Sequence, residues 1–154
     1  GVKVLRITSH GGLIIPVMSL ADIIAKRKIA VAALTRCLSS CTLLLAATPN
    51  AIATPGTRIA FHHPAPAVIG NSTDRSALAL ATAAWYARFR EYGVAPRAVA
   101  EMARHPIWEP GFAQLADMGM LKYLLDGNPP RLVAANRWCR DHAVACAPPK
   151  PATR

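Results

Sequence analysis

The N-terminal part of the chain alternates between short apolar runs and a segment whose apolar residues recur at helical spacing. Residues 2–7 are rich in β-branched side chains, and residues 29–34 form an unbroken apolar run of the length of a strand covered on both faces. Between them, apolar residues of 17–25 repeat at helical spacing, and Lys26 and Arg27 place positive charge near the end. This pattern predicts a strand, a helix and a second strand.

The alternation then continues. Residues 40–47 are almost wholly apolar and predict a helix, and residues 57–61 predict a further strand. A β-α-β-α-β series predicts a parallel sheet with right-handed crossovers, in which functional residues gather at the C-terminal ends of the strands. The fold class is therefore α/β.

The second half of the chain is mostly helical in pattern. Helices are expected over 73–92, 96–104 and 110–118, the first and last ending at Gly93 and Gly119. A terminal helix is expected over 131–144, followed by a disordered tail, because "APPKPATR" at the C-terminus is short, polar and rich in proline. No internal repeat is visible, and 154 residues suffice for one domain with a core.

Composition adds an expectation about assembly and removes two classes of partner. Hydrophobic residues make up 53% of the chain, which excludes disorder and predicts a homo-oligomer. The net charge is +10, but apart from residues 26–28 the basic residues occur singly and without interleaved aromatics, so no nucleic-acid partner is expected. The longest uncharged apolar stretch, 37–53, is too short and too polar for a membrane span.

The four cysteines form two local pairs, Cys37 with Cys41 and Cys139 with Cys146. Neither pair has the spacing of common zinc sites, so we expect disulfides in an oxidising compartment, although four cysteines permit three connectivities. A disulfide between Cys37 and Cys41 would brace the turn between them. The alternative is that the cysteines are reduced, buried thiols of a cytosolic protein.

Three predicted strands end in residues that could carry chemistry: "SHGG" at 9–12, "CLSSC" at 37–41 and "FHHP" at 61–64. A parallel sheet places all three at one edge. A serine hydrolase needs a hydroxyl nucleophile, an imidazole that takes its proton, and backbone N–H groups for the developing oxyanion. Ser39 and His62 are the candidates for the first two roles.

The oxyanion donors would come from the turns beside Ser39. Ser39 lies where a strand turns into a helix, so the N–H of Ser40 is one candidate donor. Gly11 and Gly12 can approach a substrate carbonyl without interference from a side chain and offer the second. His62 has a side chain suited to shuttling the serine proton.

Simpler roles for these residues remain open. Ser39 could be a helix N-cap, and His62 and His63 could be a strand-end pair in which one ring packs and the other faces water. A metal site with His10 is not expected, because neighbouring residues of a strand point to opposite faces and cannot easily share one ion. We expect no metal and no cofactor.

The segments "ITSHGG", "CLSSCTLLLAA" and "RIAFHHP" together resemble the Gly-Gly loop, nucleophile turn and His-containing strand of the ClpP/crotonase superfamily. The Cys-x-Ser-x-Cys form is similar to that of periplasmic Clp-protease-like proteins of bacteria. The resemblance covers roughly residues 2–125, and the order and spacing of the motifs are more specific than any one motif.

This resemblance implies a ClpP/crotonase-like fold of repeated β-β-α/β-α units with a parallel sheet and an outlying helix. It implies Ser39 as nucleophile, His62 as base, and Gly11, Gly12 and Ser40 as the lining of the oxyanion hole.

The resemblance also suggests a division of the chain. We expect a ClpP/crotonase-like domain over residues 1–128, with its N-terminal part trimmed, and a C-terminal helix and disordered tail over 129–154. The long helix from Thr73 resembles the handle helix that serves subunit packing.

The chain departs from the family at its acid. Counting back from the glycine at 119, the catalytic aspartate of the family falls near Ile107, where no aspartate stands. Glu109 is the first candidate to replace it, and Glu101 the second. The alternative for Glu109 is charge at a helix N-terminus beside a packing Trp108. Histidine also replaces proline at His10.

Three functions follow as hypotheses. The first is a Clp-like serine peptidase or hydrolase acting on a peptide or protein through an acyl-enzyme at Ser39. The second is a non-catalytic Clp-like oligomeric scaffold or peptide-binding protein. The third is a crotonase-type acyl-CoA enzyme, against which the serine and histidine speak. A periplasmic or secreted bacterial location is expected, with a possible membrane tether through a segment missing here.

Overall fold

The apolar runs form one sheet in the computed structural model, which describes residues 3–64 and 75–149. Within these ranges the sheet has seven strands, in the order β5-β4-β2-β3-β6-β7, and β1 also pairs with β2. The strands are β1 (Val4–Ser9), β2 (Ala30–Leu38), β3 (Ala51–Ala53), β4 (Arg58–His62), β5 (Ile107–Trp108), β6 (Tyr123–Asp126) and β7 (Arg131–Ala134). Strands β1, β2, β3, β4 and β6 are joined by parallel pairs, and β5 and β7 add antiparallel ones.

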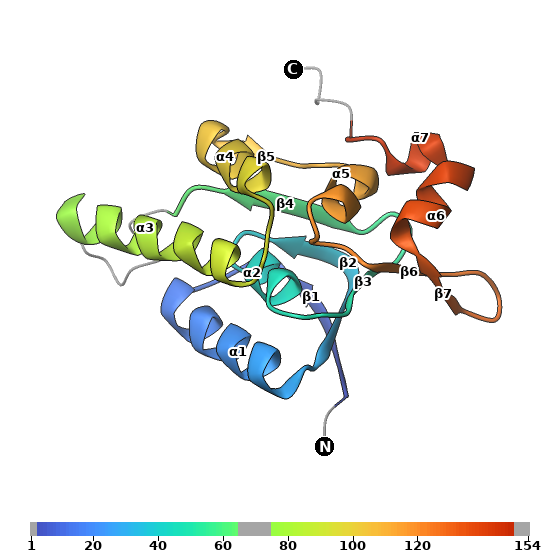
Figure 1. Cartoon of the computed structure of the whole chain (residues 1–154), viewed down its shortest axis with the longest axis horizontal. Coiled ribbons are helices and arrows are strands. Elements are labelled where there is room, and N and C mark those ends of the chain that lie inside the picture. The colour runs from blue at the N-terminus through green and yellow to red at the C-terminus, as the bar shows by residue number, and fades with distance from the viewer. Residues whose placement is uncertain (1–2, 65–74, 150–154) are drawn as a thin grey trace.

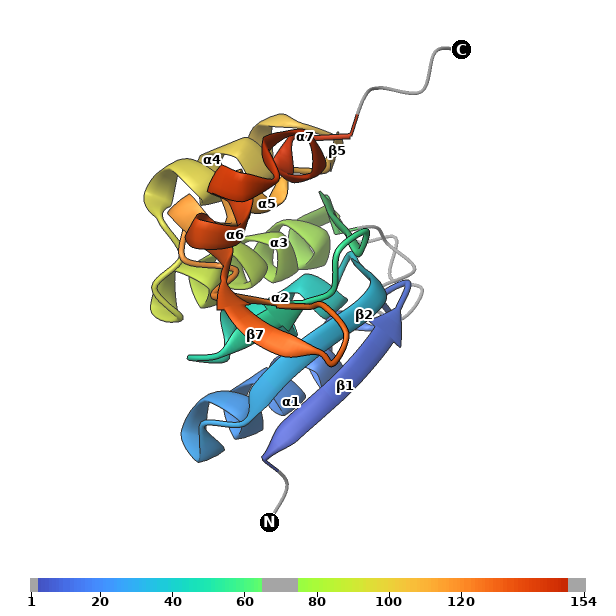
Figure 2. The same cartoon turned by 90° about the vertical axis from the view of Figure 1, so that its right-hand side faces the viewer.

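Strand β2 is the centre of this arrangement. Its first half, around Val31–Ala33, pairs with β3, and its second half, Arg36–Leu38, pairs with β4. On its other edge it pairs with β1 over most of its length. Figure 2 shows β1 and β2 side by side, with α1 behind them. Strand β2 therefore leads from the middle of the sheet to the C-terminal ends of the parallel strands, where the predicted functional residues lie.

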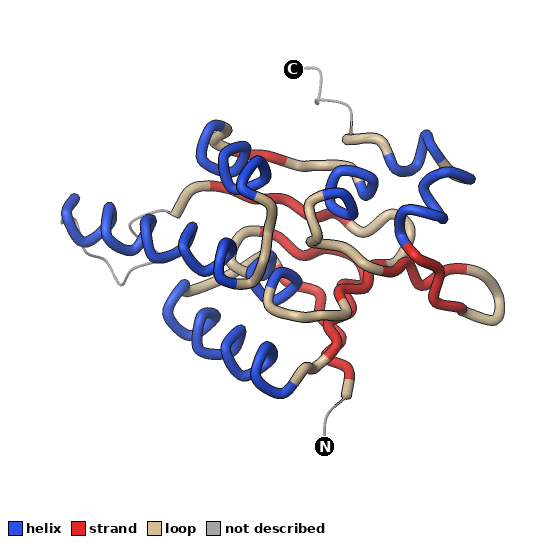
Figure 3. Tube along the Cα trace, viewed as in Figure 1, coloured by secondary structure: helices blue, strands red, loops and turns tan. Residues whose placement is uncertain are grey.

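Helices lie against one face of the sheet, behind β1 and β2 in Figure 2, and at the ends of the molecule. They are α1 (Ile14–Arg27), α2 (Cys41–Ala46), α3 (Arg75–Glu91), α4 (Pro96–Arg104), α5 (Phe112–Asp117), α6 (Ala135–Asp141) and α7 (Ala143–Cys146). Figure 3 shows the strands running from the middle to the lower right, with helices on the left and along the top. In Figure 1, α3 extends to one end of the molecule and α6 and α7 lie at the other.

Helices α1 and α2 follow the predicted pattern. Helix α1 buries Ile14, Ala21 and Ile24. It is capped by the next residue, Lys28, which adopts a left-handed conformation (φ 53°) as in a Schellman-type cap. Every residue of α2 is buried, because this helix lies between the sheet and its neighbours α1 and α3. The mixed α/β fold class is confirmed.

The C-terminal part differs from the predicted helix over 131–144. Residues Arg131–Ala134 form strand β7, which pairs antiparallel with β6, and two short helices follow. The prolines at 129–130 cannot continue a helix, and the reversal there lets β7 use the free edge of β6. The prediction was therefore wrong for the first four residues of that segment.

Several predicted features reach beyond the described residues. The N-terminal end of the first strand at Val2, the start of the long helix at Thr73 and the last five residues of the tail lie outside them. Among the helices that the structure describes, none is long and apolar enough to cross a membrane.

Candidate active site

The ends of β1, β2 and β4 meet at one edge of the sheet, as their parallel pairing requires. Ser39 directly follows β2, and its backbone N–H donates to the carbonyl oxygen of Ala60 in β4 at 2.8 Å. His62 is the last residue of β4. The glycines at 11 and 12 follow β1, whose Ser9 pairs with Cys37 of β2. The fold thus brings the three predicted motifs together.

Ser39 has an unusual backbone conformation. Its φ is 56°, in the left-handed region that non-glycine residues rarely occupy and that costs about 1 kcal/mol or more. A Cβ placed on Gly11 would lie 2.6 Å from the Ser39 Cβ and 2.9 Å from the Leu38 carbonyl oxygen, which is closer than such atoms come. Any larger residue at Gly11 would therefore displace the serine.

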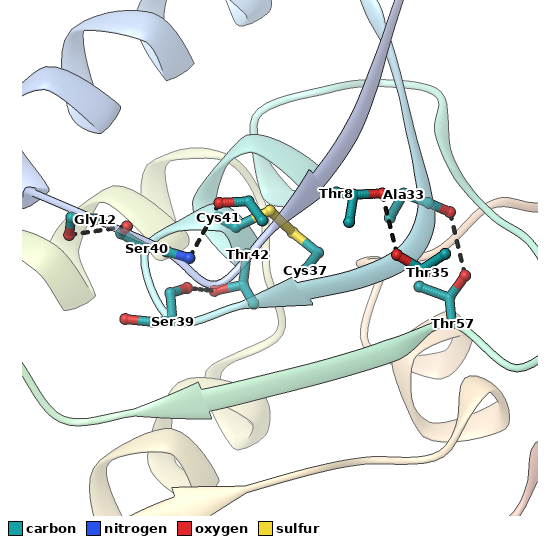
Figure 4. Close-up of a disulfide and its surroundings, with 12 residues drawn as sticks. Thr8, Gly12, Ala33, Thr35, Cys37, Ser39, Ser40, Cys41, Thr42 and Thr57 are labelled. Carbon is teal, nitrogen blue, oxygen red and sulfur yellow. Dashed lines mark hydrogen bonds between the residues drawn. A yellow bond between two sulfur atoms is a disulfide. The ribbon is translucent and has the colours of Figure 1, made fainter.

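Contacts on the far side of the turn hold Ser39 in this conformation. Cys37 and Cys41, which bracket it, form a disulfide with their Cα atoms 5.3 Å apart. The Thr42 hydroxyl and backbone N–H both donate to the Ser39 carbonyl oxygen, at 2.7 and 3.0 Å. Figure 4 shows the Ser39 hydroxyl pointing away from the disulfide and from Thr42.

The N-cap role, which the sequence left open as the alternative for Ser39, is not the one the structure shows. Ser40, rather than Ser39, occupies the N-cap position of α2, and no side-chain cap bond is made there. Ser40 is buried, and its hydroxyl donates to the Gly12 carbonyl oxygen at 3.1 Å. The Ser39 hydroxyl is therefore not used to cap the helix.

Ser40 and Gly12 also provide backbone N–H groups beside Ser39. No acceptor in the described part of the chain takes either N–H, whereas the Gly11 N–H donates to the Ser9 hydroxyl at 3.0 Å. Of the three predicted oxyanion residues, Gly12 and Ser40 thus have N–H groups without an acceptor among the described residues. Gly11 contributes the space that its missing side chain leaves.

His62 and Ser39 line the same small cavity of about 10 Å³, together with Ile14, Pro64 and Trp85. The His62 ring is exposed, and its Nδ1 lies 2.7 Å from the backbone carbonyl oxygen of His63. Within the described residues no hydrogen bond joins the Ser39 hydroxyl to His62. Catalytic hydrogen bonds of enzymes without substrate are often long and tighten only in the complex.

Glu109 does not approach His62 in the structure. Both of its carboxylate oxygens accept from Arg58, each at 2.9 Å. Strand β5 runs antiparallel to β4, with Ile107 opposite His62 and Trp108 opposite Phe61, so the chain after Trp108 moves toward the start of β4 where Arg58 lies. The hydrogen bonds and charge of Glu109 raise the pKa of Arg58. Glu101, the second candidate, pairs with Arg104 and His105.

Ile107 lies opposite His62, at the position where the acid of the family was expected. Residues opposite each other in an antiparallel pair have neighbouring side chains on the same face. The Ile107 side chain is 73% exposed. The position expected for a carboxylate is therefore occupied by an apolar side chain.

The remaining histidines of this edge have other partners. The Nε2 of His10 lies 3.0 Å from a guanidinium nitrogen of Arg36. The Nδ1 of His63 lies 3.0 Å from the hydroxyl of Tyr86 in α3. Sequence reasoning missed Tyr86 and Arg58, because only the packing of distant elements brings them to these residues.

The second predicted disulfide lies far from this edge. Cys139 and Cys146 are bonded and join α6 to α7. A Cβ on Gly111 would lie only 2.1 Å from the Cys146 carbonyl oxygen, so the disulfide-closed segment packs directly on the start of α5. Both pairings match the local pairs in the sequence and are compatible with an oxidising location.

The arrangement of the strands, the helices and the turn that carries Ser39 is a ClpP-like α/β fold. No family model and no curated protein matches the chain. Among solved structures it is similar to ClpP1 from Listeria monocytogenes, with a TM-score of 0.67 and 18% identity over 80% of this chain and 73% of that one. A point mutant of that ClpP1 gives a TM-score of 0.63 and 16% identity over 82% and 74%.

Proposed function

We propose that this protein is a serine peptidase or hydrolase that acts through Ser39 and His62. The observation that carries this proposal is the Ser39 backbone. It is held in a left-handed conformation at the end of a central parallel strand, against Gly11 and in one cavity with His62. Structural strain that the surroundings maintain is typical of functional sites. The ClpP-like fold supports the same assignment.

The chemistry would proceed in two displacements. His62 Nε2 takes the proton of the Ser39 hydroxyl as the oxygen attacks the substrate carbonyl carbon, and the N–H groups of Gly12 and Ser40 donate to the resulting oxyanion. When the tetrahedral intermediate collapses, the bond to the leaving group breaks, and His62 returns the proton to that group. Water then attacks the acyl-serine carbonyl carbon while His62 takes its proton. The bond to Ser39 breaks, His62 returns the proton to the serine oxygen, and the acid is released.

An apolar groove beside the site suggests what the substrate carries. It has a volume of about 460 Å³ and lies between α1 and α3, and Ile14 lines both this groove and the cavity at Ser39. Met18, Leu80 and Ala84 contribute further apolar surface. We propose that an apolar side chain of a peptide substrate occupies it.

The proposed assembly and location rest on other features. Leu13, which directly precedes α1, is 53% exposed, and Leu20 and Ile23 of α1 are 39% and 47% exposed. The three lie along one stripe, which we propose as a contact between copies in a homo-oligomer. The two disulfides support a periplasmic or secreted location, because such bonds persist in oxidising compartments.

A second function is favoured by Ile107. Without a carboxylate opposite His62, the same fold could be a scaffold that binds peptide segments without cleaving them. A triad that lacks its acid loses several powers of ten in rate.

A fluorophosphonate probe separates the two functions. We expect covalent labelling of the oxidised protein at Ser39, and we expect Ser39→Ala and His62→Ala each to abolish it. His105→Ala is the matched control, because His105 pairs with Glu101 outside the site. Labelling that persists in Ser39→Ala would refute the nucleophile, and the absence of labelling in the wild type would favour the scaffold.

A further inference from the structure

His62 needs an acceptor for one ring nitrogen if the other is to take the serine proton. An imidazole without such a partner exchanges between tautomers and rotamers, and only one of them presents Nε2 as an acceptor. The residue opposite His62 is Ile107, and Glu109 is bound to Arg58. No carboxylate among the described residues supplies this hydrogen bond.

A backbone carbonyl takes that place. The His63 carbonyl oxygen lies 2.7 Å from His62 Nδ1. A carbonyl oxygen can only accept, so Nδ1 is the protonated nitrogen and Nε2 is left free to accept. The tautomer is the one that a carboxylate would select.

The His63 carbonyl lies beyond the end of β4, so no pairing within the sheet fixes it. The side chain of the same residue is anchored instead. His63 Nδ1 lies 3.0 Å from the Tyr86 hydroxyl in α3, and that hydroxyl donates to the Met102 carbonyl oxygen in α4 at 3.3 Å. With the tyrosine proton on the Met102 side, His63 Nδ1–H donates to the Tyr86 oxygen.

Burial makes this anchor persistent. Tyr86 is half-buried, and burial raises the pKa of its hydroxyl, so the group stays neutral and keeps its proton. It follows Trp85, which is buried and lines the cavity at Ser39. These hydrogen bonds thus link Tyr86 of α3, through His63, to the exposed ring of His62.

We infer that Tyr86 and His63 are positioning residues that hold His62 as its Nδ1–H tautomer, in the role that a carboxylate has in serine hydrolases. The inference rests on the proposed function for its purpose, but the tautomer itself does not depend on activity. Neither residue touches the reacting atoms.

Nitrogen-15 NMR of histidine-labelled, oxidised protein tests the tautomer directly, with the His62 signals assigned by their loss in His62→Gln. We expect neutral His62 to carry its proton on Nδ1. We expect Tyr86→Phe and His63→Leu to shift it toward the mixture of a free imidazole. His63→Asn should keep the wild-type signal, because its amide nitrogen can occupy the place of Nδ1 and donate to Tyr86.

Tyr92→Phe is the matched control, because it removes a tyrosine hydroxyl bonded to Asp22 and leaves His63 untouched. In labelling, we expect Tyr86→Phe and His63→Leu to slow the reaction of Ser39 about fivefold to tenfold, the effect of one lost hydrogen bond. His63→Asn and Tyr92→Phe should react as the wild type does.

Two results would overturn the inference: an Nε2–H tautomer in the wild type, or an Nδ1–H tautomer that both Tyr86→Phe and His63→Leu leave unchanged. If Tyr86→Phe does not fold, His63→Leu and His63→Asn still decide it. An Nδ1–H tautomer in a protein that no probe labels would refute the proposed function and leave the positioning intact.

Discussion

The left-handed conformation of Ser39, the proposed nucleophile, lowers the stability of the folded protein. A non-glycine residue with a φ of 56° is destabilised by about 1 kcal/mol relative to glycine in the same conformation. The disulfide and the bonds from Thr42 maintain this conformation in the folded protein.

This strain predicts an inverted order of stability at position 39. We expect Ser39→Gly to be about 1 kcal/mol more stable than Ser39→Ala, although glycine is normally the less stable residue in ordered structure. Urea denaturation of the two variants measures the difference. An alanine variant as stable as the glycine variant would show that the backbone at this position is not strained.

Ile107 predicts a gain of reactivity from one substitution. Ile107→Asp places a carboxylate opposite His62 and should raise the rate of labelling at Ser39 at least about tenfold, because a charged acceptor stabilises the imidazolium that forms. Ile107→Asn is the control, because asparagine has nearly the shape of aspartate but no charge. Equal rates in the two variants would contradict the expectation that a carboxylate at position 107 acts on His62 in place of the His63 carbonyl.

At the scale of elements, the turn between β2 and α2 depends on its disulfide. We expect the double variant Cys37→Ala/Cys41→Ala to lose about 2 kcal/mol of unfolding free energy, as for a short closed loop. Its labelling at Ser39 should also slow, because the left-handed conformation loses a constraint. Denaturant unfolding and probe kinetics measure both effects.

The other disulfide provides the comparison. Cys139→Ala/Cys146→Ala removes the bond between α6 and α7, far from Ser39, so it should lower stability while the labelling rate of the folded protein stays unchanged. If both double variants label at the wild-type rate, the Cys37–Cys41 bond has no role in shaping the turn that carries Ser39.

Which elements the sequence predicts depends on their length and periodicity. The strand at 29–34, the apolar helix after Ser39 and the strand before His62 have strong local patterns, and all three are present. Strands β3 and β5 have three and two residues, too few to show a period, and β7 forms by pairing with the free edge of β6. Local pattern therefore predicts the central strands but not their short neighbours.

The site shows the same division. Ser39, His62 and the two glycines lie at strand ends, so the order of parallel strands suffices to place them together. Glu109 was assigned wrongly because its direction depends on the antiparallel register of β4 and β5, which no local pattern contains. Tyr86 reaches His63 only through the packing of α3, and the sequence gives no signal for that contact.

For the whole molecule, the exposed stripe of α1 predicts the assembly state. We expect the wild-type protein to be a homo-oligomer and Leu20→Glu/Ile23→Glu to be a monomer with unchanged secondary structure, because two charges would be desolvated at the contact. Light scattering after size exclusion and circular dichroism measure both properties. A wild-type monomer at micromolar concentration would contradict the proposed contact.

The central place of β2 also means that its backbone makes more hydrogen bonds to neighbouring strands than that of β4. Strand β2 is bonded on both edges, to β1 on one side and to β3 and β4 on the other, whereas β4 has β2 on one side and only two residues of β5 on the other. Segments with fewer backbone bonds open more often. We therefore expect the amide hydrogens of β2 to exchange more slowly than those of β4, and we expect changes in the separation of Ser39 and His62 to come mainly from displacement of the histidine.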